Sequence, residues 1–232
     1  MNAPDLAAAV VHWLEYEALC NRARLFSEAS LRTPVGEYLL STWGSDLITE
    51  APYPTALVPR RGRPRSVDFC LKRSGGARVW TEILEAKWIT ARRDFTQEIF
   101  DDIVRLEVVQ REGQNEPFDR YLLVAGEVKS MTDQVFSRAG NVGDGSQRTK
   151  LFESILPRVP GKKLLVPVSP VPPPVVEHWR EAARRCGLNK LPLSMGITLK
   201  GSYEPEPGKY GCWIWRITSS QNRRTKDFET AE

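Results

Sequence analysis

Two stretches decide the fold, SVDFCLK at residues 66–72 and VWTEILEAKW at residues 79–88. In the first stretch, apolar Val, Phe and Leu alternate with Ser, Asp and Cys, which is the two-residue period of a β-strand. The second stretch has the length of a pairing strand, and Ser74-Gly75-Gly76 between the two is a turn sequence. Together they predict a β-hairpin over residues 66–88.

This hairpin brings three ionisable side chains to one place. Glu85 and Lys87 are two residues apart on one strand and therefore project from the same face. With a turn near Gly75, Asp68 on the preceding strand lies close to the level of residues 83–85. Charged groups inside an apolar sheet are costly unless they are paired or bind a metal. The alternative is a solvated strand face, on which Asp68 pairs with a surface arginine or lysine.

The residue types favour a divalent cation. Two carboxylates a few ångströms apart offer the oxygen ligands that Mg²⁺ prefers, with water completing its coordination. A metal-bound water is acidified, and a neighbouring lysine can orient it for attack on a phosphodiester. The predicted catalytic residues are therefore Asp68, Glu85 and Lys87. The predicted ligands of Mg²⁺ or Mn²⁺ are Asp68, Glu85 and the carbonyl of Ala86.

The sequence around the hairpin predicts the other elements of an α/β core. The signals are helical spacing of apolar residues, a Thr-Pro helix start and a continuous apolar run. In chain order, we expect a helix from Pro4 to about residue 28, a helix capped by Thr33 with Pro34 as its first residue, a strand over 46–51, the hairpin, a helix over 95–111 and a strand over 121–125. Residues 34–125 thus give helix, three strands, helix and strand.

Residues 129–232 predict a mixed extension of strands and a helix. The expected elements are a short helix over 131–139, strands over 164–168, 194–200 and 211–218, and a helix over 175–186. In the expected organisation, residues 1–128 hold the N-terminal helix and the core, 129–220 pack on the same domain, and 221–232 form a flexible tail. Trp213 and Trp215 are interpreted as core residues, with a base-stacking surface as the alternative.

Asp68, followed by Glu85-Ala86-Lys87, resembles the D…ExK signature of the PD-(D/E)xK nuclease superfamily. That superfamily includes restriction endonucleases, Holliday junction resolvases and many phage or defence nucleases. Its shared core is a helix, a three-stranded meander, a helix and a fourth strand, which is the order expected over residues 34–125. The resemblance implies an α/β fold with a restriction-endonuclease-like core, to which the C-terminal extension is added.

The resemblance also implies an activity, that of a Mg²⁺-dependent nuclease hydrolysing DNA in a defence, mobile-element or repair system. Asp68 and Glu85 would be metal ligands, and Lys87 would serve the attacking water. Many members add an acid from the first core helix; Glu37, 31 residues before Asp68, is the matching position, and Glu15 and Glu17 compete with it. Val67 stands where a proline often precedes the aspartate. Many members are dimers, so a homodimer or larger complex is a further expectation.

The alternative function is a catalytically inactive protein that keeps the nuclease fold. Such a protein would bind nucleic acid or act as a protein-assembly module. The complete set of Asp68, Glu85 and Lys87 argues against it, because a site without catalytic function would not be expected to keep a buried lysine beside two acids. Metal titration separates the two functions.

Basic residues point to a polyanionic partner, which the resemblance to nucleases implies is a nucleic acid, DNA above all. Residues 55–95 carry ten basic and four acidic side chains, and residues 129–232 carry seventeen and ten. Arginine, the better bidentate partner for phosphate, supplies 23 of the 33 cations. The sequence predicts a phosphate-binding rim of Arg60, Arg61, Arg63, Arg65, Arg92 and Arg93. The alternatives are an AT-hook at Arg61-Gly62-Arg63-Pro64 and an ordinary solvated surface.

One further polar face follows the hairpin. Gln97, Asp101 and Arg105 are spaced by four residues and share a side of the helix expected over 95–111. They either line the site or, in the favoured interpretation, Asp101 and Arg105 form an exposed ion pair.

Composition argues against several other classes of protein. The four cysteines form no CxxC pair, which disfavours structural zinc. Two histidines give little basis for a His-based triad or a multi-His metal site. No apolar run approaches the ~18 residues of a membrane span, and the first residues lack a basic leader. The expected location is cytoplasmic, without a membrane partner.

Overall fold

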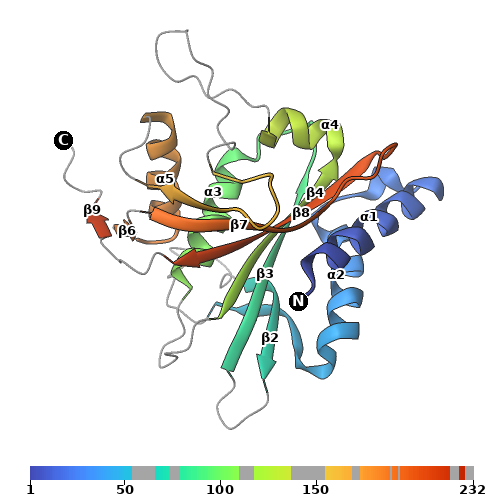
Figure 1. The fold of residues 1–232 in the computed structure, drawn as a ribbon, viewed down its shortest axis with the longest axis horizontal. Coiled ribbons are helices and arrows are strands. Elements are labelled where there is room, and N and C mark those ends of the chain that lie inside the picture. The colour runs from blue at the N-terminus through green and yellow to red at the C-terminus, as the bar shows by residue number, and fades with distance from the viewer. Residues whose placement is uncertain are drawn as a thin grey trace.

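A seven-stranded mixed sheet forms the centre of the computed structural model (Figure 1). The structure describes residues 1–53, 66–73, 79–109, 118–136, 155–168, 173–188, 190–192, 194–219 and 225–227. The strands of the sheet are β1 (Leu47–Pro52), β2 (Ser66–Arg73), β3 (Val79–Ile89), β4 (Asp119–Glu127), β5 (Lys163–Pro167), β7 (Ser194–Tyr203) and β8 (Tyr210–Ser219). Their order across the sheet is β1-β2-β3-β4-β8-β7-β5.

Five α-helices lie in the described residues: α1 (Ala3–Leu19), α2 (Glu28–Trp43), α3 (Thr96–Val108), α4 (Val128–Met131) and α5 (Pro173–Arg185). Shorter helical turns are η1 (Ala23–Leu25), η2 (Gly44–Asp46) and η3 (Thr132–Phe136). A separate two-stranded sheet pairs β6 (Lys190–Pro192) with β9 (Thr225–Asp227), so these three residues of the expected tail form a strand. None of the helices described here has the length and apolar character needed to cross a bilayer.

The first half of the sheet has the predicted order of elements. β1, β2 and β3 form an antiparallel meander, and Cys70 opposite Ile83 fixes the register of the predicted hairpin, which is confirmed. β4 then pairs parallel to β3. A parallel pair requires a crossover connection, which α3 supplies, so the C-terminal ends of β3 and β4 meet at the same edge.

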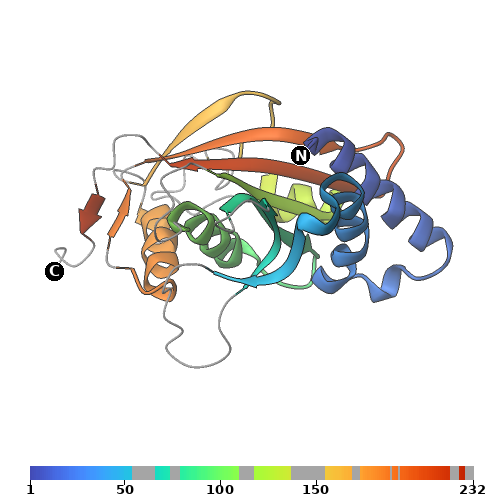
Figure 2. The same ribbon diagram turned by 90° about the horizontal axis from the view of Figure 1, so that it is seen from below.

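Helices cover the two faces of the sheet, and each face has its own core (Figure 2). Because strand residues alternate between faces, β4 contributes Leu122 and Val124 to one core and Leu123 and Ala125 to the other. This double burial explains the continuous apolar run of this strand. α3 and α5 pack on the first face, through residues such as Ile99, Ile103 and Trp179. α1 and α2 pack on the second, through residues such as Leu6, Val10 and Val35.

The N-terminal helices depart from the expected boundaries. α1 ends at Leu19 rather than near residue 28, and Asn21 follows with φ +60°, a left-handed conformation that stops a helix. α2 begins at Glu28, where Ser27 and Ser30 cap each other's backbone. Pro34 therefore lies inside α2 instead of opening it. The early start buries Leu31 completely, and this burial offsets the hydrogen bond that Pro34 removes.

The C-terminal half extends the same sheet. β8 pairs antiparallel to β4, β7 to β8 and β5 to β7, so the predicted strands and the helix over 175–186 are found. α4 and η3 form the expected short helix as far as Phe136, and residues 137–139 of the expected helix lie outside the described part. Trp213 and Trp215 are buried in the core, which confirms packing rather than base stacking. The described chain is thus a mixed α/β fold built on one central sheet.

Candidate active site on the β2–β3 hairpin

The structure brings Asp68 and Glu85 together on neighbouring strands. The carboxyl group of Asp68 lies close enough to that of Glu85 to raise its pKa. The backbone N–H of Ala86 donates to Asp68 Oδ2 at 2.9 Å. Asp68 is half-buried and Glu85 is buried, so this is not the solvated strand face of the alternative interpretation. Two neighbouring carboxyl groups can share one proton or bind one cation together.

Glu85 is surrounded by groups that act on its charge. Its Oε1 accepts a hydrogen bond from the hydroxyl of Tyr53, and the guanidinium of Arg105 lies nearby on α3. Burial raises the pKa of Glu85 to about 8, and the negative charge of Asp68 adds to this effect. Arg105 and the Tyr53 hydroxyl oppose it by lowering the pKa. At neutral pH Glu85 is therefore protonated. A cation bound to the two carboxyl groups could replace this proton.

Lys87 lies two residues further along β3, inside a ring of carboxylates. Its Nζ is 2.8 Å from Glu28 Oε2, 3.4 Å from Asp102 Oδ2 and 3.7 Å from Glu98 Oε2. Lys87 is only 7% exposed, so its charge needs these partners. The ammonium is thus fixed between the first residue of α2 and the first half of α3.

Arg105 connects the two halves of the site. It contacts Asp102, which in turn pairs with Lys87, and it also faces Glu85. We call Asp68, Glu85, Lys87, Asp102 and Arg105 the hairpin cluster. Among the described residues the hairpin cluster and its neighbours Glu28, Glu98 and Arg93 hold five carboxyl groups and three cations. With every group ionised, the site would therefore attract a cation.

A divalent cation fits this donor set. In the described residues, no group of three or more His, Cys, Asp or Glu side chains is arranged to hold a metal, so a cation here would have only the two carboxyl groups of Asp68 and Glu85 as side-chain ligands. Mg²⁺ commonly takes one or two carboxylates and completes its shell with water and substrate phosphates, so a pair is sufficient. Ala86 lies between Glu85 and Lys87 in the chain, and its N–H donates to Asp68.

The predicted helical acid lies elsewhere. Glu37 is exposed on α2, and the acid of this helix that reaches the hairpin cluster is Glu28, nine positions earlier. Glu15 accepts hydrogen bonds from the backbone N–H groups of Lys209 and Tyr210, and Glu17 pairs with Arg22. The acids of α1 are therefore engaged away from the hairpin.

Three residues of the site were missed from the sequence: Glu28, Tyr53 and Asp102. Arg105 was named as a residue that could line the site, although an exposed ion pair with Asp101 was the favoured interpretation. Asp102 carried a signal, because it falls between Ile99 and Leu106 on the apolar stripe of α3, where an acid needs a partner. The expected ion pair between Asp101 and Arg105 is not formed. Asp101 instead binds Gln97 and Arg185 of α5, at 2.9 and 3.1 Å. No local signal in the sequence marks Glu28 or Tyr53.

Two of the six predicted phosphate-binding arginines are described. Arg92 and Arg93 lie exposed in the turn between β3 and α3, where they line a pocket of about 370 Å³ together with Asp133 and Gln134. Arg93 pairs with Glu98 at 2.8 Å, and Glu98 also neighbours Lys87. Arg60, Arg61, Arg63 and Arg65 lie outside the described residues, in the segment that follows Tyr53.

No protein-family model, curated protein or solved structure matches this chain.

Proposed function

We propose that this chain is a Mg²⁺-dependent nuclease that hydrolyses DNA phosphodiester bonds. The observation that carries the proposal is the closeness of Asp68 on β2 to Glu85 on β3. The buried Lys87 lies two residues after Glu85 on β3. The order of the elements supports the proposal. The chain runs through α2, the β1–β2–β3 meander, α3 and the parallel strand β4, which is the order of a restriction-endonuclease-like core. The family assignment rests on this order and on the D…ExK spacing.

The residues of the hairpin cluster have separate roles in this proposal. Asp68 and Glu85 would hold Mg²⁺, with the carbonyl of Ala86 as a further ligand. When bound, the metal supplies an acidified water and offsets charge on the phosphate. Tyr53 and Arg105 act on Glu85 by favouring its ionised, ligating form. Glu28 and Asp102 hold the ammonium of Lys87, whose role is to orient the attacking water.

The β3–α3 turn is the proposed contact for the DNA backbone. Arg92 and Arg93 lie exposed there, directly after the strand that carries Glu85 and Lys87. Exposed guanidinium groups bind phosphates without reading sequence, so they would position DNA rather than select a site. The arginines at 60, 61, 63 and 65 belong to the same proposed rim.

Cleavage of supercoiled plasmid DNA in Mg²⁺ tests the function. Asp68→Asn keeps the shape of the side chain but removes its charge, and Lys87→Met removes the ammonium; each is expected to lower the cleavage rate at least about 100-fold. Glu37→Gln, which changes an exposed acid of α2, is the matched control and is expected to keep full activity. Circular dichroism verifies that each variant is folded. Full activity of folded Asp68→Asn would reject the proposal.

A second candidate is favoured by one observation, the engagement of Lys87 by carboxylates of two helices. A purely structural ion-pair cluster would show the same arrangement, as in a nuclease-fold protein that only binds nucleic acid or assembles with other proteins. Calorimetric titration with Mn²⁺ separates the candidates. Binding that Asp68→Asn abolishes favours the nuclease, and the absence of binding favours the inactive protein.

A further inference from the structure

The sheet face opposite the hairpin cluster is only partly covered by helices. α1 packs on β7 and β8 at one end, where Gly201 lies against the backbone of Ala3 and Pro4. Figure 2 shows α3 and α5 below β7 and β8, and no helix above β5. On β7 and β8 the side chains of Leu199, Trp215 and Ile217 point toward α3 and α5, so Lys200, Arg216 and Thr218 point to the uncovered side.

The uncovered side carries a row of cations and hydroxyl groups on β8, β7 and β5, next to the buried Tyr121 of β4. Tyr121 lies opposite Arg216, Arg216 opposite Thr198, and Thr198 opposite Lys163. A side chain at Gly196 would collide with Thr218 Oγ1 and the Cε atom of Lys163, at 2.3 and 2.7 Å. The glycine therefore lets Lys163 lie flat across β7 toward β8. We define the basic sheet face as Lys163, Thr198, Lys200, Arg216 and Thr218.

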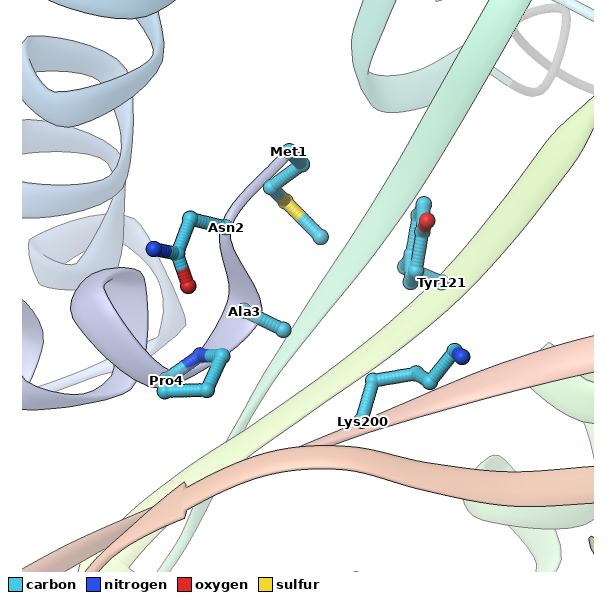
Figure 3. A pocket seen from close by; sticks show the side chains of 6 residues that line it. All are labelled: Met1, Asn2, Ala3, Pro4, Tyr121 and Lys200. Carbon is cyan, nitrogen blue, oxygen red and sulfur yellow. The ribbon is translucent and has the colours of Figure 1, made fainter. Parts of the chain in front are cut away.

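Neighbouring acids balance the positive charge of this face only in part. Asp119 pairs with Arg216 at 2.5 Å, and Glu82 pairs with the amino group of Met1 at 3.1 Å. Lys163 and Lys200 are exposed, and in the part of the chain described here neither has an acidic partner. Lys200 and Tyr121 also line a pocket of about 410 Å³ beside the first turn of α1 (Figure 3). The face thus offers two exposed ammonium groups, of Lys163 and Lys200, that have no acidic partner among the described residues.

We propose that the basic sheet face is a second contact surface for nucleic acid, which binds the phosphate backbone on the side of the sheet opposite the hairpin cluster. Ammonium groups and threonine hydroxyls are common partners of phosphate oxygens. A protein partner would be expected to find aromatic or apolar anchors, and Leu165 at the outer strand is the one large exposed apolar side chain of the described part of this face. The excess of cations in residues 129–232 also fits a polyanion.

Fluorescence anisotropy with labelled 20-mer DNA, duplex and single-stranded, tests the proposal in EDTA, where no cleavage occurs. The double variant Lys163→Glu/Lys200→Glu is compared with Arg24→Glu/Lys129→Glu, which reverses two exposed cations on η1 and α4. We expect the first variant to lose about tenfold or more in affinity and to reduce the salt slope of log K by about 1.5–2. We expect the control to lose less than about threefold.

Three outcomes would overturn the proposal: equal losses in both variants, no DNA binding by the wild type, or binding of poly-glutamate in place of DNA with the same lysine dependence. Circular dichroism verifies that the variants are folded. The proposed second surface does not depend on the nuclease activity. The variant Asp68→Asn distinguishes a failure of the surface from a failure of the enzyme. If this variant binds DNA but the wild type does not cleave it, only the proposed enzyme fails; if cleavage is intact but the lysines do not affect binding, only the second surface fails.

Discussion

The two faces of the central sheet carry their charges in opposite ways. On the side of α3, Lys87 is buried and surrounded by three carboxylates, and Arg105 is held between Glu85 and Asp102. On the other side, Lys163 and Lys200 are exposed and have no acidic partner among the described residues. A buried charge costs several kcal/mol without a partner, whereas an exposed one costs almost nothing. The first face is therefore sensitive to each of its charges, and the second is free to use them on a ligand.

The largest expected effect is on stability and comes from Asp102. Asp102→Asn removes the buried carboxylate that contacts both Lys87 and Arg105, and it leaves Lys87 with only the more exposed Glu28 and Glu98. We expect the free energy of unfolding to fall by about 3–5 kcal/mol, the cost of breaking a buried pair. Urea unfolding followed by circular dichroism measures this. Glu98→Gln, which removes a more exposed neighbour of the same lysine, should cost less than about 1 kcal/mol, and equal losses would contradict the burial argument.

The next effect depends on pH and comes from Glu85. Its pKa is about 8 in the folded protein against an ordinary value of 4.5, so the folded state binds more protons than the unfolded chain between these values. Stability is therefore highest at low pH in this window and falls as pH rises toward 8, by on the order of 1 kcal/mol per pH unit. Glu85→Gln, which imitates the protonated form, should remove this slope. Unfolding measured at pH 5.5, 6.5 and 7.5 without divalent cations checks it, and parallel curves for both proteins would contradict it.

A smaller effect is expected from Tyr53. Tyr53→Phe removes the hydroxyl that donates to Glu85 while keeping the ring that packs in the core. We expect a loss of about 1–2 kcal/mol in the free energy of unfolding at pH 7.5. The same variant should bind Mn²⁺ more weakly in calorimetry, because the hydroxyl favours the ionised form of Glu85. A change in stability without a change in Mn²⁺ affinity would assign Tyr53 to packing alone.

The smallest effect is expected on the basic sheet face. Lys200→Gln removes an exposed ammonium group, so the free energy of unfolding should change by less than about 0.5 kcal/mol. The comparison with Asp102→Asn is made in the same urea titrations. A large loss for Lys200→Gln would mean that this lysine has a structural role, and the contrast between the two faces would then be wrong.

Much of the fold could be predicted because its signals are local. The period of two in SVDFCLK, the turn at Gly75 and the apolar run of β4 each depend on a few neighbouring residues, and so does the amphipathic stripe of α3. The start of α2 was misplaced because Thr33-Pro34 is a strong local signal that loses to the burial of Leu31. Burial against a distant sheet cannot be read from neighbouring residues.

The site was predicted only in part, for the same reason. Asp68 and Glu85 could be paired from strand spacing, since a hairpin fixes which residues face each other. Glu28 reaches Lys87 from the other side of the meander, and Asp101 binds a helix more than 70 residues away. Such contacts depend on how α2, α3 and α5 dock on the sheet. The spacing of residues along the chain says nothing about docking.

The pairing of β8 with β4 has a consequence for how this chain can be divided. β4 is buried along nearly its whole length and lies between β3 and β8. A chain cut after residue 128 would keep the hairpin cluster but would expose one hydrogen-bonding side of an apolar strand. Open edges of this kind recruit other strands and lead to aggregation. The shortest piece able to fold alone must therefore include the β7–β8 ribbon, although none of the hairpin cluster lies in it.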